Sequence, residues 1–168
     1  MQTIQAWKVE TVALLRAAGL GSTCDLDARL LLQKATGLDQ ARQILLYDRQ
    51  LTESQREALA SIRDERLRHK PMAYILGRKE FFGRDFLVDE RTLIPRPDTE
   101  TLIEAVIKFS KKRYHAPSLI DVCTGSGCIG ITLALELGAE VTLCDISEGA
   151  LAVAAENAKR LLSKPVTI

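Results

Sequence analysis

The sequence predicts an α/β protein with an N-terminal helical bundle, a β-hairpin linker, and then the start of a Rossmann-like parallel sheet that is incomplete in this chain. Three observations predict this order. Apolar residues recur at helical spacing over the first 70 residues. β-favouring residues flank a glycine between residues 80 and 89. From Ser118 onward, short apolar strands alternate with helical segments. We expect residues 1–76 to form the bundle, 77–97 the linker and 98–168 the N-terminal part of the Rossmann-like domain.

Four helices are predicted in the bundle, each bounded by a cap or a glycine. They run from about Ile4 to just before Gly19, from Asp25 to Thr36, from Asp39 to Tyr47, and from Thr52 to about His69. Thr52 and Gln55 have the spacing of a capping box, which marks the start of the fourth helix. Its basic face, Arg56, Arg63, Arg66 and Lys70, could help to dock a partner, although the composition favours an ordinary solvated surface.

After the bundle the pattern changes from helical to extended. Pro71 is expected to break the helix, Glu80–Asp89 to form the hairpin, and Asp98 or Thr99 to cap a helix that ends near Lys112. The later elements are a strand at Leu119–Val122, a helix at Gly127–Leu137, a strand at Glu140–Cys144, a helix at Ser147–Leu162, and the beginning of a third strand at Pro165–Ile168. Two strands and part of a third are too few for a stable doubly wound sheet, so we expect an N-terminal portion of a longer protein.

Composition narrows the classes of function. Hydrophobic residues make up 46% and charged residues 27% of the chain, which is enough to bury a core. A net charge of +1 argues against a general polyanion binder, so no direct nucleic-acid partner is expected. No signal peptide or membrane-length apolar run is present, which predicts a soluble, cytoplasmic protein without a membrane partner. The four cysteines form no CxxC pair, so we expect small buried thiols and no metal site.

A glycine-rich turn carries the strongest functional signal. Gly125-Ser-Gly-Cys-Ile-Gly130 fits the pattern GxGxxG, follows a predicted strand and opens a predicted helix. Asp145 ends the next strand about 20 residues later, where an acid can accept hydrogen bonds from ribose hydroxyls. A tight turn without a ligand is the simpler interpretation, but these features together favour a nucleotide site. NAD and S-adenosylmethionine both use such a loop.

The charge of Asp121 distinguishes between the two candidate cofactors. It ends the first strand beside the turn, where a carboxylate would repel the pyrophosphate of NAD and attract the ammonium or sulfonium of S-adenosylmethionine. The order D-x-x-T-G-S-G therefore favours a methyl donor. Asp121 could instead cap the turn.

The sequence resembles a known family at several motifs. Asp121-Val-Cys-Thr-Gly-Ser-Gly127 is similar to motif I of class I S-adenosylmethionine-dependent methyltransferases. Pro71-Met-Ala-Tyr-Ile-Leu-Gly77, Glu80-Phe-Phe-Gly83 and Leu93-Ile-Pro-Arg-Pro-Asp-Thr-Glu100 resemble the signature of the HemK/PrmC family. Those enzymes methylate N5 of a glutamine in peptide chain release factors. The resemblance covers essentially the whole chain, since the family also has a helical bundle and a hairpin linker.

The resemblance implies a set of cofactor-binding residues and a partner. Asp121 would lie by the methionine end of the cofactor, Asp145 would take the ribose hydroxyls, and Ile146 would lie beside the adenine. Thr124, Gly125, Ser126 and Gly127 would form the donor loop, with Cys123 beside it, and Arg96 and Thr99 would lie near the mouth of the active site. Many relatives have glycine in place of Cys123, and a cysteine fits there if its φ is negative. The implied partner is a release factor, docked by the bundle.

The family's catalytic motif, Asn-Pro-Pro-Tyr, does not occur in these 168 residues. We therefore predict no catalytic residue here and expect the 168 residues alone to methylate nothing. Four other functions stay open. They are a ribosomal-protein glutamine methyltransferase, a nucleic-acid amino-methyltransferase, an NAD-dependent oxidoreductase and a non-catalytic binding fragment.

Overall fold

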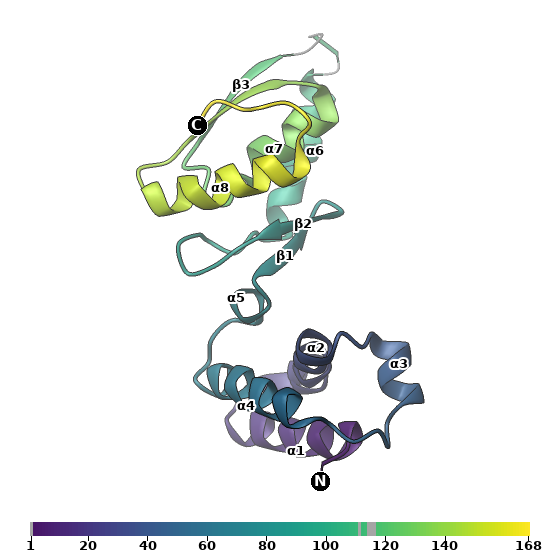
Figure 1. Ribbon diagram of the computed structural model, residues 1–168. Helices are drawn as coiled ribbons and strands as arrows, with labels where there is room; N and C mark the ends of the chain where they lie inside the picture. Colours follow the sequence, from purple (N-terminus) through teal and green to yellow (C-terminus); the bar gives the residue numbers. More distant parts are fainter. Residues whose placement is uncertain (1, 111, 114–116) are drawn as a thin grey trace. The chain divides into compact units, whose positions relative to one another are not determined.

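The structure is a computed structural model that describes residues 2–110, 112–113 and 117–168 (Figure 1). It divides into two compact units, one that reaches to Leu76 and one that begins at Gly77. The first unit is all helical, and the second contains an antiparallel hairpin and the start of a parallel sheet. The predicted fold class is therefore confirmed.

The first unit is a bundle of helices around one apolar core. Its elements are α1 (Ile4–Ala17), the 3₁₀ turn η1 (Gly21–Thr23), α2 (Cys24–Thr36), α3 (Gln40–Leu45), α4 (Glu53–Leu67) and α5 (Met72–Leu76). Trp7 of α1, Leu31 of α2 and Leu59 of α4 are almost completely buried in the shared core. These residues lie on the apolar stripes that the helical spacing predicted.

Local signals set most of the helix boundaries in this unit. The Thr52 hydroxyl accepts from Gln55 N at 3.2 Å and the Gln55 side chain accepts from Thr52 N at 3.1 Å, so the capping box is confirmed. One boundary was wrong, since the third helix ends at Leu45 and not at Tyr47. The helix before Pro71 ends at Leu67, as the proline predicted, and the Pro71 carbonyl accepts from Ile75 N at the start of α5.

The four residues of the predicted basic face are each paired with a carboxylate. Arg56 pairs with Glu53, Arg63 with Glu10 at 3.2 Å, Arg66 with Asp27 at 2.8 Å, and Lys70 with Glu65 at 2.6 Å. The Arg66 side chain is only 13% exposed and contacts a buried aspartate. The carboxylates offset the charge of this face, and the pairs of Arg63 with Glu10 and of Arg66 with Asp27 also join α4 to α1 and α2.

The second unit contains the hairpin, the two parallel strands and three helices (Figure 1). Its elements are β1 (Arg78–Phe81), β2 (Arg84–Leu87), α6 (Asp98–Ser110), β3 (Ser118–Val122), α7 (Cys128–Leu137), β4 (Glu140–Cys144) and α8 (Glu148–Leu161). β1 and β2 are antiparallel with Arg78 opposite Leu87, two residues earlier than the predicted start. The helix α6 ends at Ser110, before the predicted end, and Lys111 lies outside the described residues.

Strands β3 and β4 run parallel, with Ser118 opposite Glu140 and Val122 opposite Cys144. A parallel bridge between Thr142 and Thr167 adds to β4 where a third strand was predicted. The glycine loop that follows β3 and the residues that follow β4 therefore lie at the same edge, because the carboxyl ends of parallel strands meet there.

The core of the second unit lies between the strands, the hairpin and α7. Phe81 and Phe86 meet edge to face with centroids 6.1 Å apart, and they pack in one cluster with Ile131 and Leu143. The described residues cover only one face of β3, since Ile120 and Val122 on the other face are each 70% exposed. The hairpin, α7 and the parallel strands thus form one packed body that carries the loop.

Candidate cofactor site

The chain changes direction sharply between β3 and α7. Cys123, Gly125 and Gly127 have left-handed φ angles of 61°, 56° and 79°, and α7 begins immediately afterwards. Thr124 N donates to the Cys144 carbonyl at 2.9 Å, which ties the loop to the end of β4. This is the strand, turn and helix order that the glycine spacing predicted.

Asp121 holds the loop from inside. Its Oδ2 accepts from the Thr124 hydroxyl at 2.7 Å and from Gly130 N at 2.9 Å. A Cβ at Gly130 would lie 3.0 Å from that oxygen and 2.4 Å from Leu143 Cδ2, so only glycine fits there. Capping of the turn, the alternative that the sequence left open for Asp121, is therefore confirmed. Its carboxylate also puts negative charge beside the loop.

Asp145 holds the same loop from the β4 side. Its Oδ2 accepts from Gly125 N at 2.9 Å and its Oδ1 from Ser147 N at 3.0 Å. These backbone N–H groups, Ser147 first and then Gly125, lower the pKa of the Asp145 carboxyl below its usual value. Asp145 is therefore ionised at neutral pH, and each oxygen keeps a lone pair for a further donor such as a ribose hydroxyl.

The predicted site residues divide into an outward and an inward group. Thr124 and Ser126 are buried, as is Gly127, so they shape the loop from within. The side chains that reach solvent are Cys123, Asp145 and Ile146, and Ile146 is completely exposed. A Cβ at Gly125 would meet nothing within 4 Å, so the space beside its backbone is open. Bare backbone, an ionised acceptor and an apolar side chain fit an adenosine-containing ligand.

The cysteines differ from the expectations in two ways. The negative φ that was the condition for a cysteine to fit at position 123 is not met, because Cys123 has a φ of 61° where the chain turns into the loop. A side chain in this region costs about 1–2 kcal/mol relative to glycine. In addition, only Cys24 and Cys128 are buried, whereas Cys123 and Cys144 are exposed because the described residues cover one face of the strands.

This difference predicts a pattern of thiol reactivity. Burial raises the pKa of the Cys128 thiol to about 11. At about pH 8 a thiol with that pKa is more than about 100-fold less ionised than an ordinary cysteine, and only the thiolate reacts. We expect iodoacetamide to alkylate Cys123 and Cys144 in the folded protein and to reach Cys128 only after unfolding. Peptide mass spectrometry over time measures this, and equal rates at Cys128 and Cys123 would contradict the burial of Cys128.

Arg96 and Thr99 are not joined to this group. Thr99 N donates to the Arg96 carbonyl at 3.0 Å at the start of α6, and no hydrogen bond or ion pair of the described residues links either one to the loop. The sequence reasoning also missed Asn157, whose side chain contacts the loop. A signal was present, because Asn157 is the polar member of an apolar stripe that includes Val153 and Ala154 on α8.

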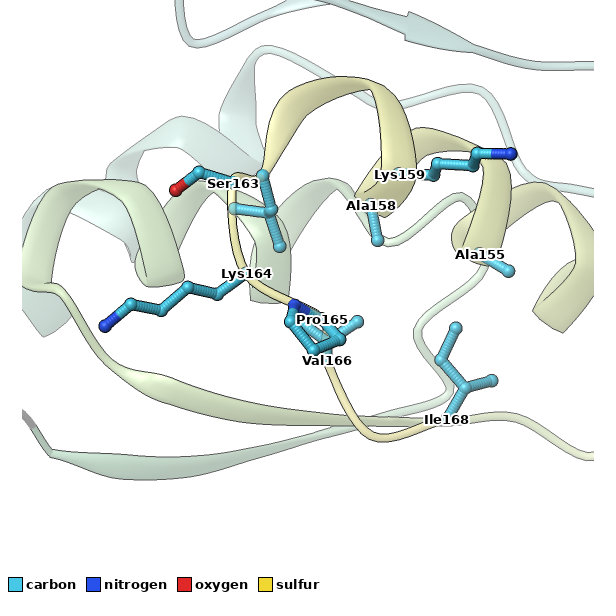
Figure 2. Close-up of a pocket in the computed structure, with 9 residues that line it drawn as sticks. Ala155, Ala158, Lys159, Ser163, Lys164, Pro165, Val166 and Ile168 are labelled. Carbon is cyan, nitrogen blue, oxygen red and sulfur yellow. The ribbon is translucent and has the colours of Figure 1, made fainter.

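Two pockets lie away from the loop. One, of about 340 Å³, is formed by α8 and the segment after it (Figure 2). Ala155, Ala158, Lys159 and Leu162 line it from the helix end, and Ser163, Lys164, Pro165, Val166 and Ile168 complete it. The other, of about 580 Å³, is in the first unit beside α3 and is lined by residues that include Ile44 and Tyr47. Neither contains a residue predicted to bind the cofactor.

The described residues contain no group of three or more His, Cys, Asp or Glu side chains that could hold a metal ion. None of their helices has both the length and the apolar character needed to cross a lipid bilayer.

The fold and the loop together define a class: the second unit is the start of a Rossmann-like parallel sheet, with the architecture expected for a class I methyltransferase. Comparison with known proteins agrees with this class and indicates a more specific family. Residues 7–77 match the family described as "PrmC N-terminal domain". The resemblance to the HemK/PrmC family is thereby confirmed for the helical unit.

Curated relatives extend the match beyond the helical unit. The chain is 46% identical to a release factor glutamine methyltransferase of Chlorobaculum tepidum, over 79% of the chain and 47% of that relative. It is 41% identical to one of Leptospira interrogans, over 83% of the chain and 49% of the relative. A third, from Bradyrhizobium diazoefficiens, is 38% identical over 95% of the chain and 54% of the relative. The chain thus spans about half the length of these relatives.

Proposed function

We propose that the loop from Asp121 to Gly127, with Asp145 and Ile146, binds S-adenosylmethionine. The single observation that carries this proposal is the ionised Asp145 carboxylate beside the open backbone of Gly125 and the exposed Ile146. Asp145 would accept hydrogen bonds from both ribose hydroxyls, and Ile146 would lie against the adenine. The negative charge of Asp121 favours a cationic methyl donor over a pyrophosphate. When bound, S-adenosylmethionine supplies an electrophilic methyl group on a sulfonium.

We further propose that the whole protein methylates N5 of the glutamine in the Gly-Gly-Gln loop of a peptide chain release factor, and so acts in translation termination. The named activity of the relatives supports this proposal. In it, residues 1–76 dock the release factor, residues 77–97 link the units, and residues 98–168 hold the methyl donor. Arg96 and Thr99 would lie on the substrate side, where the linker enters α6.

An amide nitrogen is a poor nucleophile because its lone pair is delocalised into the carbonyl. Methyl transfer to it therefore depends on alignment with the methyl group and on hydrogen bonds that hold the amide in place. The family's Asn-Pro-Pro-Tyr motif is proposed to do this, and it does not occur in these 168 residues. The residues described here would then fix the donor but would not present the acceptor.

The test is tandem mass spectrometry of release factor after incubation with S-adenosylmethionine and the natural protein that contains these residues. We expect one added methyl group on the glutamine of the Gly-Gly-Gln peptide, and none when the 168 residues are used alone. Methylation of a ribosomal protein or of nucleic acid in parallel incubations, with the release factor unmodified, would replace this proposal with one of the alternative substrates. Efficient methylation by the 168 residues alone would contradict the division of roles.

A further inference from the structure

Asn157 is a buried polar residue that takes no part in the cofactor contacts proposed above. It lies on the inner face of α8, is 0% exposed, and has Val153, Ala154 and Ala158 around it on the helix. A carboxamide in such a place costs free energy unless its donors and acceptor are all satisfied. Its partners therefore show what it holds together.

The Asn157 side chain joins two segments that are far apart in the sequence. Its Oδ1 accepts from Leu87 N at 2.7 Å, and its Nδ2 donates to Leu87 O at 3.0 Å. It thus pairs with both backbone groups of Leu87, as a neighbouring strand would at the edge of the hairpin. The same Nδ2 donates its second hydrogen to Ser126 O at 2.9 Å, in the middle of the glycine loop.

The bond to Ser126 acts on the peptide plane that leads into Gly127. Gly127 has a φ of 79° and immediately precedes α7, so this plane sets the direction in which the loop enters the helix. Asp121 and Asp145 hold the loop through Gly130 N and Gly125 N. Of these three side chains, Asn157 is the one that also forms hydrogen bonds to the hairpin.

We propose that Asn157 is a positioning residue that fixes the cofactor loop against the β-hairpin, so that cofactor binding and the order of the hairpin edge are coupled. This inference rests on the proposed function, since it assumes that the loop holds S-adenosylmethionine. Two consequences follow. Loss of the Nδ2 donors weakens cofactor binding more than it weakens the fold, and bound cofactor protects Leu87 N–H although Leu87 belongs to β2.

The first experiment compares Asn157→Asp with Gly138→Ala by calorimetric titration with S-adenosylmethionine. Asn157→Asp keeps the size and the Oδ1 acceptor but puts an oxygen where Nδ2 donates to Ser126 and Leu87. Gly138→Ala is the matched control, because Gly138 also has a left-handed φ, of 61°, and lies after α7, outside the proposed site. At a temperature where both variants are folded, we expect at least a ten-fold weaker affinity for Asn157→Asp and less than a two-fold change for Gly138→Ala.

The outcomes separate this inference from the proposed function. Equal affinity of the wild type and Asn157→Asp overturns the positioning role while the cofactor site stands. Failure of the wild type to bind S-adenosylmethionine overturns the cofactor site. The link between the loop and the hairpin through Asn157 is then tested by amide hydrogen exchange without ligand. In that experiment, Asn157→Asp must speed exchange at Gly127 N–H more than Gly138→Ala does.

If Asn157→Asp does not fold, amide hydrogen exchange in the wild-type protein tests the coupling instead. Added S-adenosylmethionine must then slow Leu87 N–H more than Val88 N–H, which donates to Gly77 O at 3.3 Å and has no bond to Asn157. Equal effects on the two amides would overturn the coupling.

Discussion

Replacement of Asp145 with alanine is expected to weaken the binding of S-adenosylmethionine by about 100-fold. The carboxylate would accept hydrogen bonds from two ribose hydroxyls, and hydrogen bonds to a charged group are stronger than neutral ones, so the loss of both is expected to lower the affinity on the order of 100-fold. The variant also removes the acceptor for Gly125 N, which loosens the loop. Titration calorimetry with the purified chain measures the change directly.

Ser147→Ala is the matched control for this experiment. Ser147 Oγ accepts from Ala150 N at 3.2 Å and caps α8, and Ser147 lies two residues after Asp145 but has no part in the proposed ribose contact. Its loss should cost about 1 kcal/mol of stability and leave the affinity nearly unchanged. Because the pKa of Asp145 is lowered, its carboxylate is lost only when the pH falls below the usual range for aspartate. An Asp145→Ala variant that binds as tightly as wild type would remove Asp145 from the site.

The second large effect is expected for Gly127→Ala, which should lower the free energy of unfolding of the second unit by about 2–5 kcal/mol. A left-handed alanine costs about 1–2 kcal/mol, and an added methyl group in a filled space costs about 1–3 kcal/mol more. The new Cβ would lie 2.7 Å from Ile131 Cδ1 and 3.3 Å from Ala154 Cβ, and Ile131 is completely buried. Relief of this contact would require the Ile131 side chain or the loop backbone to shift.

Gly138→Ala separates the two contributions. Gly138 has a φ of 61°, yet a Cβ there would meet nothing within 4 Å, so only the backbone cost of about 1–2 kcal/mol applies. Urea denaturation followed by far-UV circular dichroism compares the variants, and fluorescence of Trp7, the one tryptophan of the chain, reports on the first unit alone. Equal losses for Gly127→Ala and Gly138→Ala would show that the space beside Gly127 is not filled.

Local signals explain why much of the fold could be predicted. The strand Glu140–Cys144 and the capping box at Thr52 were both found where they were expected, because each depends on residues a few positions apart. The same holds for the loop, whose turn, helix and following acid all lie within about 20 residues.

Features that depend on distant partners could not be predicted in the same way. Asn157 contacts Leu87, 70 residues earlier, and Arg63 pairs with Glu10 across 53 residues. A single sequence gives no measure of such pairings, so Asn157 was passed over and the arginines were expected to be solvated. The exposure of Cys144 likewise depends on which face of the strands is covered, and the apolar residues around it indicate burial without indicating the covering element.

The most direct measurement is calorimetric titration of the wild-type chain with S-adenosylmethionine and, separately, with NAD. Charge at Asp121, the ionised Asp145 and the exposed Ile146 predict one S-adenosylmethionine per chain and no measurable heat with NAD. Binding of NAD in preference to S-adenosylmethionine would contradict the proposal that this loop holds a methyl donor.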